Sequence, residues 1–203
     1  MMKLHWSPRS PFVRKVMIFA HETGLAGRLD CVRTVVAMTA PNPALRQDNP
    51  LFKIPTLVLD DGSSLYDSGV ICAYLDTLHA GARLIPAIGP ERFTALRRQA
   101  LGDGFLDFLL LWRHERERAQ PSRELLAGFA TKFGAVLERL DSERAGLAET
   151  QLGIGHIAIF CALSYLDFRF RDLDWRPAHP ELAAWLAAFE QRPSAQATAV
   201  VED

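Results

Sequence analysis

The sequence predicts a chain in two parts, an α/β part first and an all-helical part after it. Short β-like segments alternate with helical segments in the N-terminal third, and strand patterns stop beyond Pro86. Long amphipathic segments follow, and 203 residues are enough for two small packed domains. We expect an α/β domain at 1–80, a Gly- and Pro-containing linker at 81–89 and a helical domain at 90–203.

The α/β part has boundary signals for each of its elements. Ser10 before Pro11 is a good helix start, because Ser caps free amides and Pro fits the first helical position. Asp61-Gly62 is a tight turn between two short strands. The expected order is βαβαββα, with at most a short helix at 41–50. The elements are strands at 3–6, 29–36, 56–59 and 63–66, and helices from 11 to about 23 and 68 to about 79.

The helical part contains four segments with apolar residues at helical spacing. They lie at 90–119, 122–146, 154–169 and 180–191.

Composition and charge exclude several classes. The chain has 23 basic and 24 acidic residues, which is typical of an ordinary folded protein and not of one that binds nucleic acid. The N-terminus has no signal-peptide pattern and no apolar run reaches membrane-spanning length, so we expect a cytoplasmic protein. Cys31, Cys72 and Cys161 are too far apart for a CxxC pair, and we expect buried thiols.

The segment from Ser7 to Val16 places a hydroxyl at the amino end of a helix, directly after a strand. Taken alone, Ser10 is a helix cap. A helix N-terminus also favours a bound anion such as a thiolate, and the Ser10 hydroxyl can donate to sulfur while it accepts from an amide. The two roles are compatible.

Two further segments combine a structural role with a binding role. Pro55 precedes an apolar strand; a cis bond there would turn the backbone of Ile54 outward to pair with a peptide-like ligand, although a trans strand-initiating proline is the default. Asp67 and Ser68 stand where a strand gives way to a helix. Both residues suit helix capping. The Ser68 hydroxyl and amide also suit a ligand carboxylate, and the Asp67 carboxylate suits a ligand ammonium group.

In order and spacing, the three segments resemble the glutathione transferase superfamily, over nearly the whole chain, and most of all its bacterial serine-type members. The resemblance implies a thioredoxin-like N-terminal domain, glutathione as co-substrate, no metal and a homodimer. It places the catalytic residue at Ser10, because Phe12 has no hydroxyl. The implied glutathione-binding residues are Ser10, Phe12, Lys53, Ile54, Pro55, Asp67 and Ser68.

The helical part carries the second set of candidates. Phe105, Phe108 and Trp112 either line an apolar pocket for the electrophile or form plain helical core. The charges from Trp112 to Arg118 are expected to form a solvated face with ion pairs and not a metal site. Two segments of the helical part also resemble this superfamily: Ala162 to Arg169, and His179 to Leu182 leading to Gln191-Arg192-Pro193. The family's Ser or Thr cap and Asp are replaced by Gly153 and His156, so we expect a lost cap bond worth about 1 kcal/mol.

The implied function is attack by the glutathione thiolate on an electrophilic carbon of a mostly apolar small molecule, a detoxifying conjugation. A protein that binds glutathione without transferase activity is an open alternative. So is an isomerase or dehalogenase that regenerates glutathione. A thiol-disulfide oxidoreductase of the same fold would need a cysteine where Ser10 stands.

Overall fold

The computed structural model describes residues 1–202 and divides them into two compact units. The α/β unit contains residues 1–87 together with the C-terminal segment that starts at Pro193, and the helical unit is Ile88–Arg192. This agrees with the expected mixed sheet followed by a helical domain. The predicted boundaries at 80 and 90 stay predictions, and the C-terminal end differs, as described below.

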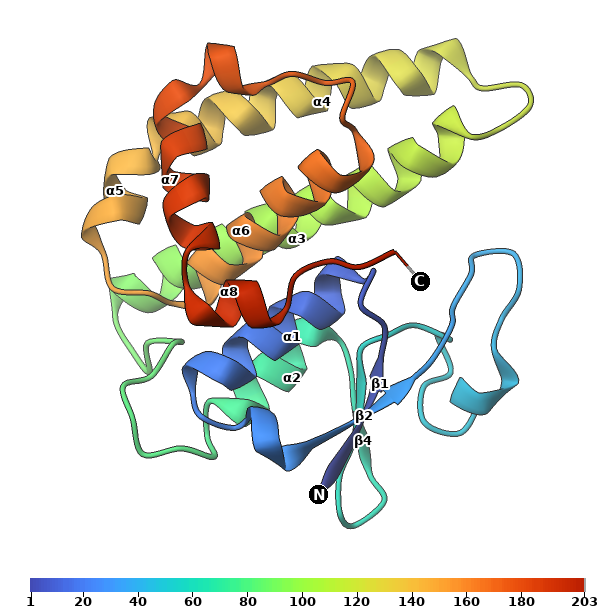
Figure 1. Cartoon of the computed structure of the whole chain (residues 1–203), viewed down its shortest axis with the longest axis vertical. Helices are drawn as coiled ribbons and strands as arrows, with labels where there is room; N and C mark the ends of the chain where they lie inside the picture. The colour runs from blue at the N-terminus through green and yellow to red at the C-terminus, as the bar shows by residue number, and fades with distance from the viewer. Residues whose placement is uncertain (203) are drawn as a thin grey trace. The chain divides into compact units, whose positions relative to one another are not determined.

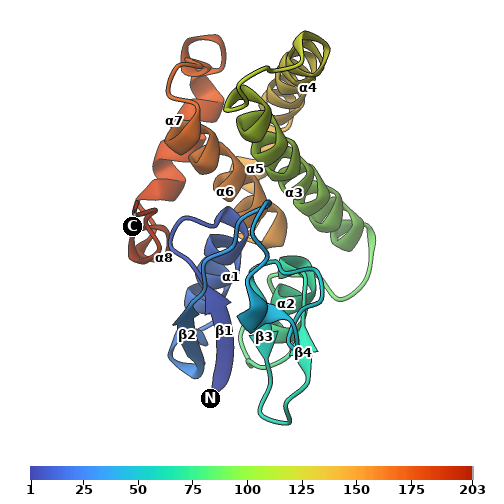
Figure 2. The ribbon, with the colours of Figure 1, turned by 90° about the vertical axis from the view of Figure 1, so that its right-hand side faces the viewer.

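A four-stranded mixed sheet forms the centre of the α/β unit (Figure 2). The strand order is β2-β1-β3-β4, with β1 parallel to β2, and β3 antiparallel to both β1 and β4. The parallel pair is joined by a helix, as a crossover connection requires. The strands are β1 (Met2–Trp6), β2 (Leu29–Arg33), β3 (Thr56–Val58) and β4 (Ser64–Leu65).

Helices α1 (Pro11–Glu22) and α2 (Ser68–Leu75) pack side by side on one face of this sheet (Figure 2). Their apolar faces meet the sheet in a core whose members are fully buried, including Leu4, Phe19, Leu57 and Ile71. Gly24, just after the C-cap Thr23 of α1, has a φ of 71°, a conformation that glycine adopts without a Cβ penalty.

The second helix of the expected βαβαββα order is reduced to a single 3₁₀ turn, η2 (Pro43–Leu45); another, η1 (Ala26–Arg28), precedes β2. Prolines at 41, 43 and 50 limit the helical run, because proline lacks an amide proton and restricts the residue before it. Asn42 caps the turn by accepting from the Ala44 amide at 3.0 Å.

Helix α2 ends earlier than predicted, because Asp76 binds the chain beyond it. Its buried carboxylate accepts from the Leu84 and Ile85 amides at 3.0 and 3.3 Å and pairs with His79 at 3.1 Å. These bonds anchor the first half of the predicted linker to the α/β unit.

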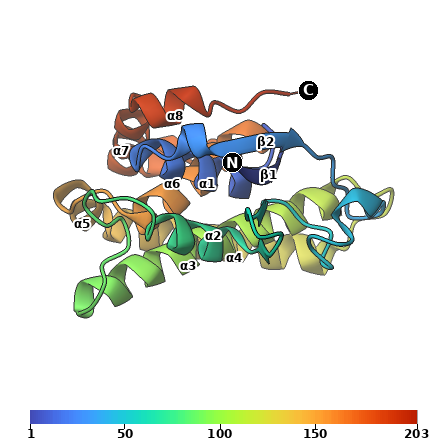
Figure 3. The same ribbon diagram turned by 90° about the horizontal axis from the view of Figure 1, so that it is seen from below.

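The helical unit consists of five α-helices and a 3₁₀ turn, η3 (Arg176–Ala178), within the part of the chain that the structure describes. Helix α4 runs alongside α3 (Figures 1 and 3), and α3 and α6 make the most extensive helix contact. The helices are α3 (Pro90–Arg116), α4 (Arg123–Ser142), α5 (Arg144–Glu149), α6 (Ile154–Arg169) and α7 (Pro180–Glu190).

The predicted helix over 122–146 is divided at Glu143. Both carboxylate oxygens of Glu143 accept from Arg97 of α3 at 2.7 Å, and Arg98 donates to it at 3.3 Å. The hydrogen bonds to Arg97 hold the pKa of the Glu143 carboxyl below its usual range. This anchor to α3 coincides with the change of direction between α4 and α5.

The sequence analysis places the C-terminal segment in the helical domain. In the structure, the segment from Pro193 onward belongs instead to the α/β unit. A short helix that the sequence analysis missed, α8 (Pro193–Ala197), packs against α1 in the α/β unit (Figure 1). The Ser194 hydroxyl donates to Glu22 at 2.5 Å, and Arg14 donates to the Ala195 carbonyl at 3.2 Å. These polar contacts to α1 are not visible as a sequence pattern.

Among the described residues, no helix combines the length and the apolar character needed to cross a membrane.

Candidate functional site

Ser10 caps α1, as the sequence analysis expected. Its extended backbone places the hydroxyl oxygen 3.3 Å from the Val13 amide, which donates to it. The Ser10 hydroxyl proton has no acceptor among residues 1–202. The turn before it is closed by Ser7, whose carbonyl accepts from the Ser10 amide at 3.2 Å and whose hydroxyl accepts from the Arg9 amide at 3.4 Å. A hydroxyl donor therefore remains available at the positive end of α1.

The Ile54–Pro55 peptide bond is cis, so the structure has the isomer that the sequence analysis singled out. The amide and carbonyl of Ile54 have no hydrogen-bond partner in the described part of the chain. The Ile54 side chain packs with Val13 of α1 and with Leu45, which places this unpaired backbone close to the first turn of α1. Unpaired extended backbone of this kind can accept an added peptide strand.

The loop before Ile54 is held by Asn49, which the sequence analysis did not identify. Asn49 is 1% exposed, and its side-chain amide donates to the Lys53 carbonyl at 3.1 Å and to the Thr56 hydroxyl at 2.9 Å. Its side-chain oxygen accepts from the Leu51 amide at 2.9 Å. The Asn-Pro dipeptide marks a turn here, but only the fold shows that the asparagine is buried.

Phe52 and Lys53 complete this loop. Phe52 has a φ of 54°, a left-handed conformation that is unfavourable for a large side chain and is found most often where surrounding contacts impose it. The Lys53 side chain is exposed. A cationic group is thus available beside the unpaired backbone of Ile54.

Asp67 caps α2, also as expected. Its Oδ1 accepts from the amides of Gly69 and Val70 at 2.9 and 3.3 Å, and the peptide bond from Tyr66 to Asp67 is cis. Ser68 is 2% exposed, and its hydroxyl has no partner among the described residues. An amide and a hydroxyl at the start of α2 are therefore arranged to receive an anionic oxygen.

The sheet topology brings these three segments to one edge. His5 near the end of β1 pairs with Thr56 at the start of β3, and Leu57 of β3 pairs with Leu65 at the end of β4. Because β3 is antiparallel to both neighbours, the end of β1, the start of β3 and the end of β4 lie at the same edge of the sheet. The start of α1, the backbone of Ile54 and the start of α2 follow or precede these strand ends.

The cysteines differ from the sequence expectation at one position. Cys72 and Cys161 are buried, but Cys31 is exposed, because β2 is an edge strand of the sheet. Partial desolvation and the neighbouring Asp30 carboxylate raise the pKa of the Cys31 thiol. The thiolate is the reactive form of cysteine, so a raised pKa leaves less of the Cys31 thiol ionised near pH 7.

The aromatic candidates of the helical unit form one cluster. Phe105 and Trp112 are 1% and 6% exposed, and Phe108 is half-buried. Trp112 lies 5.2 Å from Phe170 between ring centroids, and Phe105 lies 5.1 Å from Phe108. This packing favours the core interpretation for Phe105 and Trp112. A role of the three residues toward an electrophile stays a prediction, and Phe108 has the exposure for it.

The charged segment at the end of α3 is only partly the solvated face that was expected. Arg113 and Glu117 form an ion pair at 2.7 Å. Glu115, however, is 6% exposed and accepts from the Ser122 amide at 2.6 Å and from Arg118 at 3.2 Å, so it holds the turn into α4. No group of three His, Cys, Asp or Glu residues in the described chain could hold a metal ion.

The expected loss of the cap bond at the start of α6 is wrong. The Gly153 amide donates to Nδ1 of His156 at 3.1 Å, and the His156 amide donates to the Gly153 carbonyl at 3.0 Å. His156 therefore supplies the acceptor that the family's Asp would provide. The bond fixes the tautomer, with Nε2 facing the Thr150 hydroxyl at 3.2 Å.

Comparisons with known proteins agree with this fold. The glutathione S-transferase N-terminal domain matches residues 9–78, and the C-terminal domain of the same family matches residues 113–188. The uncharacterized GST-like protein YibF of Escherichia coli K12 is 32% identical over 185 residues, which are 89% of this chain and 90% of that protein.

Two solved structures of a glutathione transferase family member from Pseudomonas fluorescens Pf-5 are also similar. One has bound glutathione, with 44% identity, a TM-score of 0.95 and full coverage of both chains. The other has bound S-(propanoic acid)-glutathione, with 42% identity, a TM-score of 0.91 and coverage of 99% and 100%. The chain belongs to the glutathione S-transferase family. Its assignment to a serine-type subclass stays a prediction.

Proposed function

We propose that this protein is a glutathione transferase that joins the glutathione thiolate to an electrophilic carbon of a mostly apolar small molecule. The observation that carries the proposal is the convergence of three unsatisfied polar groups at one sheet edge: the Ser10 hydroxyl, the Ile54 backbone and the start of α2. The relatives with bound glutathione and a bound glutathione thioether support it.

Each group has a partner in glutathione. The Ile54 amide and carbonyl pair with the cysteinyl backbone, and Ser68 receives the γ-glutamyl carboxylate while the free Asp67 oxygen offsets the ammonium group. Lys53 is placed to bind a carboxylate. Ser10 donates its hydroxyl proton to the sulfur, with Phe12 and Pro55 shaping the adjoining surface.

Thiolate supply controls the proposed reaction. A thiol with a pKa near 8.5 is only a few per cent ionised at pH 7, and lowering that pKa by about two corresponds to about 2.7 kcal/mol. The Ser10 hydrogen bond and the positive end of α1 together supply a stabilisation of this size. The thiol proton passes to solvent, a sulfur–carbon bond forms, and the leaving group departs with its electron pair.

Two tests address binding and ionisation separately. Glutathione binding measured by calorimetry should weaken about tenfold or more in Ser68→Ala, because a hydrogen bond to a charged group is lost. It should be unchanged in the control Ser63→Ala, a serine on an exposed turn. The ultraviolet thiolate band of bound glutathione should fade in Ser10→Ala and persist in Ser7→Ala.

The outcomes distinguish the alternatives. If the wild-type protein does not bind glutathione, the proposal is contradicted. If the thiolate band fades in Ser7→Ala and not in Ser10→Ala, then Ser7 is the hydrogen-bond donor to the sulfur. Binding with a thiolate band but no conjugation of any electrophile favours a glutathione-binding protein. Turnover without net consumption of glutathione favours an isomerase or dehalogenase.

We also propose a homodimer in the cytoplasm. Large apolar side chains are exposed in both units, including Leu51 at 62%, Val70 at 47% and Phe93 at 71%, and such side chains are common in subunit interfaces. Sedimentation of the purified chain would give a single species of twice the monomer mass if this is right.

A further inference from the structure

The loop that leads to Ile54 is attached to the sheet through Asp48. The Asp48 carboxylate accepts from Nζ of Lys3 at 2.7 Å and bonds to Nε2 of His5 at 2.8 Å, and both of these residues belong to β1. The Asp48 carbonyl accepts from the Ser64 hydroxyl of β4 at 2.6 Å. Because β3 lies between β1 and β4, the contacts of this one loop residue bridge across a strand.

His5 is the buried member of this group. It is 4% exposed, and its Nδ1 lies 2.8 Å from the Thr34 hydroxyl. The hydrogen bond from Lys3, followed by that from His5, lowers the pKa of the Asp48 carboxyl, so Asp48 is charged near neutral pH. A carboxylate can only accept, which places the proton of the bond between His5 and Asp48 on Nε2. A charge-assisted hydrogen bond therefore joins β1 to the loop.

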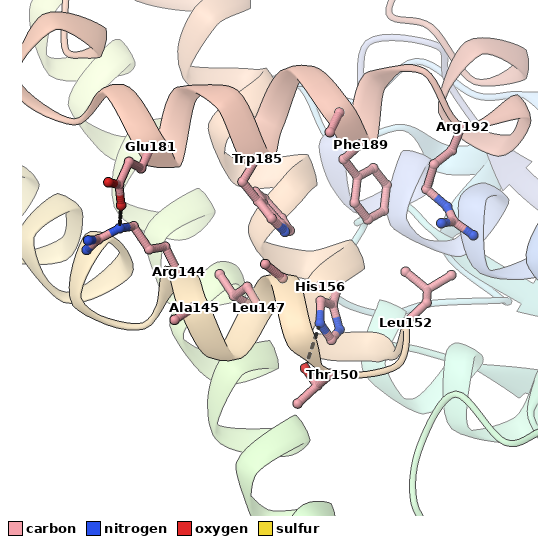
Figure 4. A pocket seen from close by; sticks show the side chains of 12 residues that line it. Arg144, Ala145, Leu147, Thr150, Leu152, His156, Glu181, Trp185, Phe189 and Arg192 are labelled. Atoms are coloured by element: carbon pink, nitrogen blue, oxygen red, sulfur yellow. Dashed lines mark hydrogen bonds and ion pairs between the residues drawn. The ribbon is translucent and has the colours of Figure 1, made fainter.

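The long range of these contacts distinguishes His5 from His156, a buried histidine of the helical unit. The ring nitrogens of His156 contact the Gly153 amide and the Thr150 hydroxyl, which lie within six residues of it (Figure 4). The partners of His5 lie 29 and 43 residues away in the chain. His156 thus stabilises a local turn, whereas His5 fixes a distant segment against the sheet.

Asn49 connects this attachment to the Ile54 backbone. It directly follows Asp48, and its buried side-chain amide donates to the Lys53 carbonyl at 3.1 Å. Lys53 in turn directly precedes Ile54. A short series of bonds therefore leads from β1 to the unpaired amide and carbonyl of Ile54.

We propose, on the basis of the proposed function, that His5 and Asp48 are positioning residues that hold the Ile54 backbone where it pairs with the cysteinyl unit of glutathione. Both act through the loop. The thiolate is stabilised separately, by Ser10 at the start of α1. Loss of the bond between His5 and Asp48 should therefore weaken glutathione binding without changing the ionised fraction of the glutathione that is bound.

Two substitutions of His5 test this bond directly. The amide nitrogen of Gln is the same number of bonds from Cβ as Nε2, so His5→Gln can still donate to Asp48. The amide of Asn reaches only as far as Nδ1, so His5→Asn can contact Thr34 but loses the bond to Asp48. Calorimetry should give a glutathione affinity within about twofold of wild type for His5→Gln and about tenfold weaker for His5→Asn.

Asp48→Asn removes the charge and keeps the shape of the side chain. It should weaken glutathione binding about fivefold, because the bonds from Lys3 and His5 are no longer charge-assisted on the acceptor side. Asp60→Asn is the matched control, since Asp60 also pairs with a cation, the amino group of Met1 at 3.0 Å, in an exposed pair outside the loop. It should leave glutathione affinity unchanged.

Two further measurements separate positioning from a general loss of stability. The ultraviolet thiolate band, recorded at saturating glutathione, should keep its wild-type intensity in His5→Asn and Asp48→Asn. Hydrogen exchange without glutathione should be faster in both variants at the Leu51 amide, which donates to Asn49 at 2.9 Å. Exchange in the middle of α1 should not change.

The results distinguish the positioning role from the proposed function. Equal glutathione affinity of wild type, His5→Gln and His5→Asn would overturn the positioning role alone, and so would equal weakening in the two variants. A thiolate band that fades at saturation in Asp48→Asn would overturn it as well. Absence of glutathione binding by the wild-type protein would contradict the proposed function itself. Asp48 is only half-buried, so Asp48→Asn provides the test if a His5 variant does not fold.

Discussion

Asn49 is the residue on which the geometry of the loop before Ile54 depends. Asn49→Ala leaves the Leu51 amide without its acceptor and removes two donors from buried oxygen atoms. We expect the free energy of unfolding to fall by about 2 kcal/mol. Glutathione binding should weaken as well, because the Ile54 backbone is no longer held in place. Chemical denaturation and calorimetry measure the two effects.

Asn42 provides the matched control for Asn49. It also accepts from an amide two residues ahead, but its side chain bonds to Ala44 and to the Val35 carbonyl and makes no hydrogen bond to the loop before Ile54. Asn42→Ala should cost less than about 1 kcal/mol and leave glutathione affinity unchanged. Equal effects of the two substitutions would show that Asn49 has no special role in the loop.

His156 makes the stability of the helical unit depend on pH. Burial, together with Arg98, lowers its pKa in the folded protein below the value of 6.5 expected for an unfolded chain. The unfolded chain therefore binds the proton more readily, so stability should fall as the pH drops below about 6.5 toward the folded-state pKa. Protonation of Nδ1 would also remove the acceptor of the Gly153 amide.

A substitution isolates this contribution from other titrating groups. The amide oxygen in His156→Asn can accept from Gly153 but does not titrate, so the variant should lose less stability than the wild-type protein between pH 7 and pH 5. Urea denaturation at each pH measures the difference. Parallel pH curves for the two proteins would contradict the role assigned to His156.

At the scale of elements, the contact between α3 and α6 depends on Gly102. A Cβ at this position would lie 2.6 Å from the Ala158 carbonyl carbon and 2.8 Å from the Ile159 nitrogen. These are backbone atoms that cannot move aside without separating the helices. Gly102→Ala should therefore lower the free energy of unfolding by about 1 to 3 kcal/mol.

Gly104, on the same helix, is the control. A Cβ there meets no atom within 4 Å, so Gly104→Ala should raise the free energy of unfolding by up to about 1 kcal/mol through the greater helix propensity of alanine. Urea denaturation of the two single variants should thus give changes of opposite sign. Stabilisation by both substitutions would mean that α3 and α6 need no close approach.

At the scale of the whole molecule, the C-terminal segment from Pro193 onward belongs to the α/β unit. A chain that stops after Arg192 loses the hydrogen bonds from Ser194 to Glu22 and from Arg14 to Ala195, and it uncovers α1. We expect the α/β unit to lose roughly 3 kcal/mol of stability. Hydrogen exchange at the amides of β1 and α1 resolves this unit from the other.

A chain that stops after Ala199 keeps α8 and should exchange like the full-length protein. Faster exchange in both shortened chains would place the stabilising contacts beyond α8. Unchanged exchange in both would show that the C-terminal segment does not support α1.

The sequence alone predicted the features that arise from local patterns. Capping by Ser10 and Asp67 and the bounds of α6 were readable, because capping residues and apolar periodicity act within a few residues. The resemblance to the glutathione transferase superfamily rested on three such segments and on their order in the chain. Their convergence at one sheet edge needed the antiparallel pairing of β3 with both of its neighbours.

Tertiary contacts decided the rest. The hydrogen bonds of Asn49, the use of His156 as a helix cap, the burial of Glu115 and the return of α8 to α1 join residues whose side chains have several possible roles in sequence. Local propensity selects helix or strand, but a buried polar side chain is defined by the partner that the fold brings to it. The sequence therefore determined the class of fold and the first residues of the helices that hold the proposed glutathione site. The three-dimensional packing decided which polar groups are satisfied and which are left for a ligand.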